Sequence, residues 1–312
     1  MVAKGTSDPR IHVDLAHLRR LAGGARNISF LPRQPARSAL NGRHASRLRG
    51  RGLNFEELRN YQVGDDPRTI DWKVTARTGE PYVRVYTEER DRPALLLVDQ
   101  RMTMFYGTQM NMKSVTAAEA AALAAFRIRA QGDRVGGIVF TDDHIAELRP
   151  KASNAALNRL LSVIAGANSA LNAERTVART LSLNDPLEAA ARIATTGMLI
   201  LVFSDFAETD DRTERLIRQL SLHNDVILFP ITDPTGLKLP DDFRIVASDG
   251  DLQVELDGRE TATTRSVQEI VSARLGRAIG WTRKYGIPVL PLTCDRETLP
   301  QIMDLMGVRG AR

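Results

Sequence analysis

The feature that most constrains this chain is the alternation of short aliphatic runs with helix-forming stretches after residue 92. Two of these runs, Ala94–Val98 and Met198–Phe203, contain only apolar residues. Strands that are buried on both faces show such continuous runs, and they occur almost only in parallel sheets that helices cover. The sequence therefore predicts an α/β domain over residues 93–312, with a mainly parallel sheet and helices on both faces.

The other predicted elements of this domain keep the same rhythm. Ser114–Gln131 is rich in alanine and predicts a helix, which Gly132 is placed to end. Val267–Tyr285 predicts a long amphipathic helix. Ser248-Asp249-Gly250 is a turn signal, so we expect an inserted hairpin near residues 243–256. The remaining predicted helices are 155–165, 187–194 and 212–222, and the remaining predicted strands are 134–140, 144–148, 226–231 and 287–292.

Polar residues follow two of the aliphatic runs directly. Asp99 follows the first run, and Ser204-Asp205 follows the run that ends at Phe203. Open α/β sheets bind ligands at the carboxyl ends of their strands, so we expect these side chains to converge at one edge. Each residue alone is equally consistent with a structural role, because Asp and Ser are common helix caps. Their joint occurrence at the predicted edge favours a function there.

Charge is distributed unevenly along the chain, whose formal net charge is +5. Residues 1–54 carry eleven Lys/Arg and two acids, whereas residues 93–312 carry twenty-five Lys/Arg and twenty-seven acids. The basic leader suggests an anionic partner, which could be nucleic acid, an acidic protein or a membrane surface. The alternative, which is the commoner role of a charge run, is a solvated or locally paired arm. The stretch Arg33–Arg51 contains no Phe, Tyr or Trp to stack on bases, which argues against single-strand recognition and makes nucleic acid the less favoured partner.

Composition and motifs exclude several classes of protein. Cys294 is the single cysteine, which excludes an intrachain disulfide and a cysteine-rich zinc site. The apolar runs are too short to cross a bilayer, and the first ten residues lack the apolar segment of a signal peptide. We therefore expect a cytoplasmic protein without a membrane span. The sequence contains no Walker A loop and no Gly-x-Gly-x-x-Gly loop, and its five histidines suggest no Ser–His–Asp set.

Residues 1–92 do not follow the strand–helix rhythm, and we expect them to form an extended segment packed on the main domain. Within this segment, proline and aspartate favour a turn, and the planar fork of Arg68 can pair with neighbouring carboxylates while Trp72 is buried. The stretch is interpreted as a salt-bridged brace or, alternatively, as a surface for a partner or metal. Its most distinctive part reads Gly64-Asp65-Asp66-Pro67-Arg68-Thr69-Ile70-Asp71-Trp72.

This motif, followed by Val83-Arg84 and by Glu88-Glu89-Arg90-Asp91, closely resembles the signature of the domain of unknown function 58 family. In element order the resemblance covers nearly the whole chain. It implies a von Willebrand factor A-like domain over residues 93–312 and a β-rich, family-specific segment before it. It also implies a MoxR-type AAA+ ATPase as a partner, together with an unidentified client protein. Many relatives carry N-terminal membrane helices, whereas we expect none in this chain.

The resemblance also implies a candidate metal site. In von Willebrand factor A domains the first strand ends in Asp-x-Ser-x-Ser, and a threonine and a second aspartate complete a Mg²⁺ site. Asp99 and Asp205 match the two aspartates, and Thr103 keeps a hydroxyl. Arg101 replaces the first serine and cannot ligate a cation, and the stretch at the threonine position, Asn184-Asp185, has no threonine.

We therefore expect a degenerate metal site, in which the guanidinium of Arg101 lies between Asp99 and Asp205 and neutralises both. Mg²⁺ binding through Asp99, Thr103 and Asp205 is the alternative, which a fixed cation beside the site opposes. No cofactor is expected.

The function that these features favour is a non-enzymatic interaction module. Its partner-binding face would surround the strand ends, where Met102, Met104, Phe105 and Tyr106 belong to either an interface or the core. One alternative is a metal-dependent hydrolase of the haloacid dehalogenase type, but such enzymes need a second acid at the position of Arg101. The other alternative is nucleic-acid binding through the leader. The partner-binding candidates are Asp99, Arg101, Thr103, Ser204 and Asp205.

Overall fold

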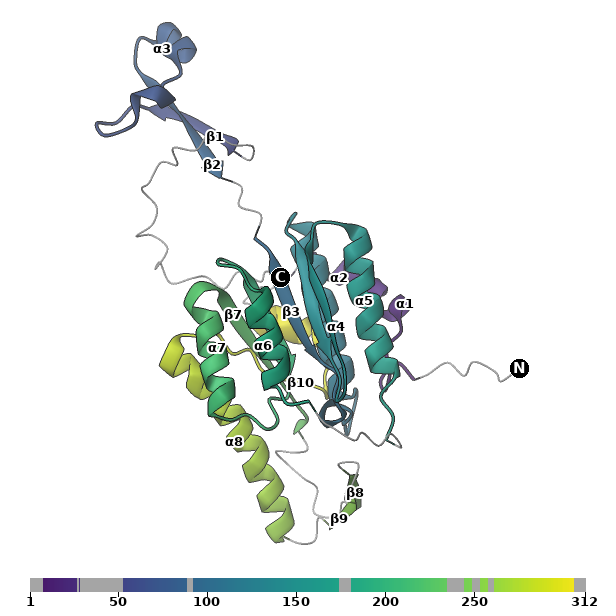
Figure 1. Ribbon diagram of the computed structural model, residues 1–312. Coiled ribbons are helices and arrows are strands. Elements are labelled where there is room, and N and C mark those ends of the chain that lie inside the picture. The colour runs from purple at the N-terminus through teal and green to yellow at the C-terminus, as the bar shows by residue number, and fades with distance from the viewer. Residues whose placement is uncertain are drawn as a thin grey trace. The chain divides into compact units, whose positions relative to one another are not determined.

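The computed structural model describes residues 8–26, 28, 53–88, 92–173, 181–234, 244–248, 253–257 and 261–305. The chain forms two compact units (Figure 1). The main unit comprises Met1–Phe30 and Arg92–Arg312, and the small unit comprises Leu31–Asp91. The basic stretch Arg33–Arg51 lies outside the described residues.

The main unit is built on a six-stranded, mostly parallel sheet with the strand order β10-β7-β6-β3-β4-β5. Only the edge strand β5 runs antiparallel to its neighbour. The predicted mainly parallel α/β architecture is thus confirmed. The strands are β3 (Ala94–Asp99), β4 (Val135–Phe140), β5 (Ile145–Lys151), β6 (Leu199–Ser204), β7 (Asp225–Thr232) and β10 (Leu292–Thr293).

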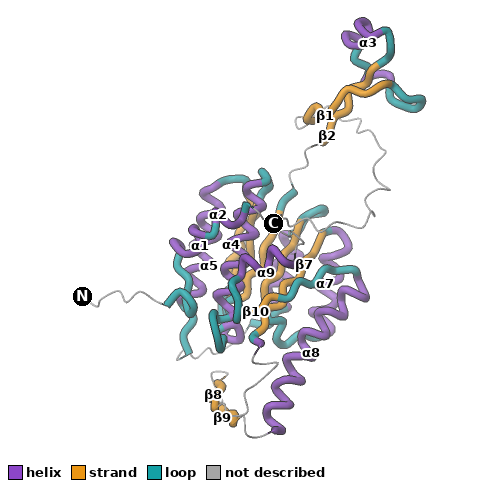
Figure 2. The backbone as a smooth tube through the Cα atoms, turned by 180° about the vertical axis from the view of Figure 1, so that it is seen from behind, coloured by secondary structure: helices purple, strands orange, loops and turns teal. Residues whose placement is uncertain are grey.

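Helices cover both faces of this sheet, with one apolar core on each face (Figure 2). Successive residues of β3 point to opposite faces, so Leu96 and Val98 enter one core while Leu95 and Leu97 enter the other. This double burial is why β3 is apolar from Ala94 to Val98. The first core is covered by α1 (Leu15–Arg20), α2 (Ala22–Ala25), α4 (Lys113–Ala130), α5 (Asn154–Ser169) and α9 (Thr298–Leu305), and the second by α6 (Asn184–Ile193), α7 (Asp211–His223) and α8 (Thr261–Tyr285).

The predicted helices and strands of this unit are present, and most of their ends differ from the predicted ends by a few residues. The exception is the strand expected at residues 287–292. There only the two residues of β10 pair as a strand, with an isolated bridge between Leu228 and Val289. Pro288 and Pro291 lack the backbone N–H that a continuous ladder requires. The predicted hairpin near 243–256 corresponds to β8 (Arg244–Ser248) and β9 (Gln253–Asp257).

The first helices belong to the main unit, although the sequence analysis grouped all of residues 1–92 in one segment. Val13 and Leu18 are fully buried in the core that α4 and α5 share. Asp14 caps α1 by accepting a hydrogen bond from the backbone N–H of His17 at 2.6 Å. The ring of His17 lies 2.6 Å from the carboxylate of Glu119 on α4. These contacts make Val13 and α1 part of the core of the main unit.

The small unit contains an antiparallel pair, β1 (Leu53–Asn60) and β2 (Tyr82–Glu88), and the short helix α3 (Trp72–Thr78). Asp66 and Asp71 cap a 3-10 turn (Pro67–Thr69) and α3 through backbone N–H groups. Their carboxylates are thus directed at the backbone rather than at Arg68. Asp65 is held by the fork of Arg59 at 2.7 and 2.8 Å, which corrects the expectation that Arg68 pairs with it.

Trp72 does not form the expected buried anchor within the small unit. Its side chain, in the first turn of α3, is 68% exposed. Among the residues that the structure describes in both units, no helix combines the length and apolarity needed to span a membrane.

Candidate functional site

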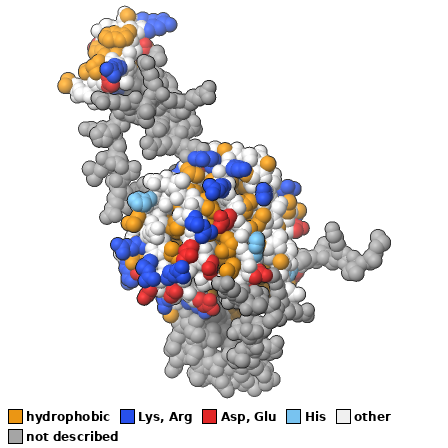
Figure 3. Space-filling view, viewed as in Figure 1, with side chains coloured by type: hydrophobic (Ala, Val, Ile, Leu, Met, Phe, Trp, Pro, Cys, Tyr) orange, Lys and Arg blue, Asp and Glu red, His pale blue; other side chains and the backbone are white. Residues whose placement is uncertain are grey.

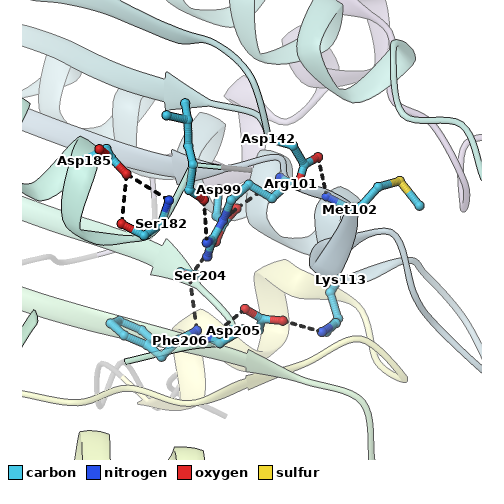
Figure 4. Close-up of polar contacts among 12 residues, drawn as sticks. Asp99, Arg101, Met102, Lys113, Asp142, Ser182, Asp185, Ser204, Asp205 and Phe206 are labelled. Atoms are coloured by element: carbon cyan, nitrogen blue, oxygen red, sulfur yellow. Dashed lines mark hydrogen bonds and ion pairs between the residues drawn. The ribbon is translucent and has the colours of Figure 1, made fainter. Parts of the chain in front are cut away.

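The carboxyl ends of β3 and β6 bring the predicted site residues together. The two strands are parallel neighbours, and Val98 lies level with Phe203. The next residues, Asp99 and Ser204, are therefore side by side, and the Ser204 hydroxyl donates to Asp99 Oδ2 at 2.6 Å (Figure 4). Asp205 follows directly. The expected convergence of Asp99, Ser204 and Asp205 at one sheet edge is present.

Asp99 is neutralised by Arg101, two residues away. Arg101 donates from Nε to Oδ1 at 3.1 Å and from its terminal nitrogen to Oδ2 at 2.8 Å, and its backbone N–H also reaches Oδ1 at 3.0 Å. Asp99 is fully buried and Arg101 is 2% exposed. Burial alone lowers the pKa of the Arg101 guanidinium, but the charge and hydrogen bonds of Asp99 outweigh it and raise the pKa. The Arg101 guanidinium therefore stays protonated beside Asp99.

Asp205 has a different cation as its partner. Nζ of Lys113, the first residue of α4, lies 2.7 Å from Asp205 Oδ2, and the backbone N–H of Ala207 donates to Oδ1 at 3.0 Å. Burial tends to raise the pKa of Asp205, but the positive charge and hydrogen bond of Lys113 lower it overall. The expectation that Arg101 bridges both acids is wrong. Arg101 binds Asp99, and Lys113 binds Asp205.

Lys113 is the site residue that sequence reasoning missed. It lies ninety-two positions before Asp205, so no local spacing connects the two residues. One signal was available. A lysine in the first turn of a helix faces the positive end of the helix dipole, which is unfavourable unless an anion compensates it. Here that anion is Asp205.

The loop after β6 is held in an unusual backbone conformation. Phe206 and Glu208 have φ values of 52° and 57°, in the left-handed region that side-chain-bearing residues rarely adopt. The Phe206 N–H donates to Ser204 Oγ at 3.0 Å, and the buried Phe206 ring packs edge-on against Trp281 at 6.1 Å between centroids. Such conformations persist only where the surroundings over-determine them, and they are common at functional sites. The site residues therefore also fix the loop that follows them.

The remaining predicted site residues lie around this centre. Thr103 is exposed in a short 3-10 turn (Met102–Met104), unlike the buried acids. Met104 is part of the core, whereas Met102, Phe105 and Tyr106 are half-buried. At the expected threonine position, Asn184 accepts from Thr213 at 2.8 Å and Asp185 accepts from Ser182 at 2.8 Å. Asn184 thus connects α6 to the start of α7, whereas Asp185 stabilises a local turn.

A series of buried hydrogen bonds connects the site to Val13, just before α1. Gln100, next to Asp99, donates to the carbonyl of Ser114 at 3.0 Å and accepts from Asn168 at 2.9 Å. Asn168 in turn accepts from the backbone N–H of Val13 at 2.7 Å. Because each of these groups is satisfied, this series of hydrogen bonds fixes the site against α4, α5 and the N-terminal segment.

Comparison with known proteins identifies the family. The model of the family described as "Protein of unknown function DUF58" matches residues 57–275. The chain belongs to the DUF58 family. The family resemblance that we inferred from the motif at residues 64–72 is thereby confirmed.

Relatives of this DUF58 protein include the uncharacterized proteins Mb1516 of Mycobacterium bovis and Rv1480 of Mycobacterium tuberculosis. Each is 26% identical over 291 residues, which cover 93% of this chain and 90% of the relative. Similar solved structures include BatB from Bacteroides thetaiotaomicron, with a TM-score of 0.42 and 10% identity over 70% of this chain and 97% of that one. An aerotolerance-related membrane protein from Bacteroides fragilis gives a TM-score of 0.41 and 11% identity, over 70% and 99% of the two chains.

The side chains of this DUF58 site do not fit a Mg²⁺ ion. Both oxygens of Asp99 already accept hydrogen bonds from Arg101, and Oδ2 also accepts from Ser204. Lys113 occupies one oxygen of Asp205. Across the described ranges of the chain, no group of three or more His, Cys, Asp or Glu side chains is arranged to hold a metal. The positive charges of Arg101 and Lys113 already pair with the two carboxylates that would ligate the ion. They would repel Mg²⁺ strongly, because like charges repel strongly in a buried site.

Removal of the Arg101 charge should be strongly destabilising. Arg101→Met leaves Asp99 buried without a counter-charge, so we expect urea denaturation to show a loss of roughly 3–5 kcal/mol in the free energy of unfolding. Asp99→Asn/Arg101→Met should recover part of this loss, because no buried charge remains. The matched control is Arg192→Met, which removes the exposed partner of Glu147 and should cause no measurable change. A change in Arg101→Met as small as that of the control would contradict this assignment.

Lys113→Met should change how stability depends on pH. The pKa of Asp205 is lowered in the folded protein, so its carboxylate adds stability above an unfolded-state pKa of about 4, and this is lost as the pH falls. Without Lys113, burial raises that pKa and the carboxylate opposes folding until it is protonated. Urea denaturation should thus show a difference in the free energy of unfolding between wild type and variant that is largest near neutral pH. This difference narrows as the pH falls through the raised pKa of the variant toward the lowered pKa of the wild type.

The control for this experiment is Lys151→Met, which removes an exposed lysine at the end of β5. Its effect should be small at every pH. A stability difference for Lys113→Met that stays constant across the pH range would show that the ion pair with Asp205 is not its cause.

Proposed function

We propose that this DUF58 protein is a non-enzymatic interaction module that presents the carboxyl edge of its sheet to a protein partner. The observation that carries the proposal is the internal compensation of the two site carboxylates. Asp99 lies 2.8 Å from Arg101 and Asp205 lies 2.7 Å from Lys113, and all four residues are buried. A site arranged in this way is complete before any ligand arrives.

Internal compensation argues against the hydrolase alternative. A carboxylate that acts as nucleophile or general base must offer an oxygen to the substrate. Asp99 is fully buried and both of its oxygens are occupied. Arg101, at the position where a haloacid dehalogenase has its second acid, is always protonated and cannot serve as a general acid.

The loop that follows Arg101 supplies a suitable contact surface. Met110 is exposed, and Met102, Phe105 and Tyr106 are half-buried beside it in sequence. Methionine and aromatic side chains are enriched in interface cores. The loop is held from behind, because Phe105 stacks on His12 at 5.4 Å between centroids and the carbonyl of Arg10 accepts from Met112 N–H at 2.8 Å. A pre-ordered loop loses little conformational entropy when it binds.

The finer part of the proposal is a von Willebrand factor A-like adaptor that works with a MoxR-type AAA+ ATPase and a client protein. Its support is the family resemblance, together with the placement of Asp99 and Asp205 at adjacent strand ends. In this proposal Arg101 and Lys113 supply the positive charge that Mg²⁺ supplies in von Willebrand factor A domains. The degenerate metal site then docks its partner without a metal.

The metal-free character of the site can be measured by titration calorimetry with Mg²⁺ and Mn²⁺. We expect no stoichiometric heat at micromolar concentrations of either ion, since Arg101 and Lys113 repel a further cation. Asp99→Ala is the companion variant. Stoichiometric micromolar binding that disappears in Asp99→Ala would overturn the proposed replacement of the metal.

Capture of the ATPase tests the docking face. We expect the wild-type chain to retain a MoxR-type ATPase of the same organism, and Thr103→Glu/Met110→Glu to retain at least about tenfold less, since two buried charges oppose an interface core. The matched control is Ala152→Glu/Ala155→Glu, which adds the same charge at exposed positions near the end of β5, by the opposite edge of the sheet. Circular dichroism verifies that all variants fold.

Two outcomes of this capture would contradict the proposal in different ways. Failure of the wild-type chain to retain the ATPase would contradict the proposal that a MoxR-type ATPase is the partner. Equal retention by the wild-type chain and by Thr103→Glu/Met110→Glu removes the carboxyl edge as the docking face.

A further inference from the structure

A second surface with a clear chemical character lies on α7. Its inner side packs into the core through Thr213, Ile217 and Leu220. Its outer side carries Arg215, Arg218 and Leu222, which recur at helical spacing and are all exposed. Leu222 is 65% exposed, although it is a large apolar residue.

The end of α8 continues this surface. Lys284 and Tyr285 both contact Glu214 of α7, at 2.9 and 2.6 Å. Lys and Arg side chains gather over α7 and the neighbouring end of α8, at the left of the main unit in Figure 3. We call this surface the α7–α8 basic face, and it consists of Arg212, Arg215, Arg218, Leu222, Arg283 and Lys284.

Few acids offset these cations. Glu214 is bound by Tyr285 and Lys284, which lower its pKa to about 2, and Glu188 is paired with Arg212. Asp211 remains as an exposed acid in the first turn of α7. Among the described residues, Arg215, Arg218 and Arg283 have no carboxylate within ion-pair distance. Residues 93–312 contain slightly more acids than bases, so this face is a local segregation of charge.

Two cations of this face, Arg218 and Lys284, are held in position. The guanidinium of Arg218 lies 5.8 Å from the ring centroid of Tyr285, whose hydroxyl is tied to Glu214. The indole of Trp281 anchors the same end of α8 in the core. A guanidinium that is already ordered loses less entropy on binding, and its planar fork matches a carboxylate with two parallel hydrogen bonds.

We propose that the α7–α8 basic face is a second docking surface and that its partner is an acidic protein surface. Arginine and tyrosine are among the residues that dominate protein–protein interfaces, and the exposed Leu222 beside them is an apolar side chain that a protein partner can bury. A lipid surface fits less well, because the apolar side of α7 is used by the core and too few apolar side chains remain to enter a bilayer. A nucleic acid would leave Leu222 against phosphates, where it gains nothing.

This surface is separate from the carboxyl edge. His223 and Asn224, at the end of α7, bond to Gly197 and Met198 at the amino end of β6, so α7 runs from one edge of the sheet to the other. Leu222 therefore lies toward the edge opposite to Asp99. A chain that connects two proteins needs two such faces, but the inference about α7 depends on its own residues and not on the carboxyl edge.

Fluorescence anisotropy with a labelled polyglutamate peptide and the full chain tests this inference. We expect Arg215→Glu/Arg218→Glu to weaken binding at least about tenfold, since the reversed charges repel the peptide. The matched control is Arg149→Glu/Arg159→Glu, which reverses two exposed arginines on β5 and α5 and should change affinity less than about twofold. Thermal denaturation shows whether both variants remain folded.

Two parallel probes separate the other classes of partner: duplex DNA and vesicles of phosphatidylserine and phosphatidylcholine. We expect the Arg215→Glu/Arg218→Glu change to affect these probes no more than the control change does. Equal losses of peptide binding in both variants would overturn the inference. Binding of DNA or vesicles that depends on Arg215 and Arg218, without such dependence for the peptide, would overturn it as well.

Discussion

The buried ion pair between Asp99 and Arg101 is the interaction on which the arrangement of the site depends. Two charges removed from water are costly unless their geometry satisfies them fully, and here both carboxylate oxygens are engaged, by Arg101 and by Ser204. Ser204 links this pair to the loop after β6, and Asp205 links that loop to Lys113 on α4. The loop after β6 is thereby fixed to β3 and to α4, which both lie far before it in the sequence, and this suits a surface that must present a constant shape.

The sequence predicts this arrangement in part, and the successes have a simple cause. The run at Ala94–Val98 is apolar throughout because its residues alternate between two cores, and this pattern identifies a covered parallel sheet. Asp99 and Ser204 meet because parallel strands end at one edge, a consequence of topology alone. The contact of Lys113 with Asp205 could not be predicted, because the path of the loop between β3 and α4 sets the position of the Lys113 side chain. The burial of Val13 and Leu18 in the main core escapes prediction for another reason: the leucine spacing of the six-residue helix α1 indicates an apolar side but not which core that side joins.

Net charge is a poor guide to the surfaces of this protein. The body of the chain is nearly neutral by count, yet its charges are sorted by place: paired and buried at the carboxyl edge, exposed and mostly basic on α7. Arg101 and Arg215 contribute equally to the net charge of the protein, but they differ in what they can bind. The first is neutralised within the molecule, whereas the second can act on a partner. Burial, which composition does not reveal, decides between these roles.

The N-terminal helix has a consequence for the order in which the protein assembles. His17 lies against Glu119, and the same carboxylate accepts a hydrogen bond from Thr298 on α9 at 2.5 Å. One glutamate thus joins α1 to α9. During synthesis, His17 leaves the ribosome long before Thr298 exists, so this junction is among the last to close. Helix α1 gains its full set of contacts only once α9 is made, and loss of either helix leaves Glu119 with one partner fewer.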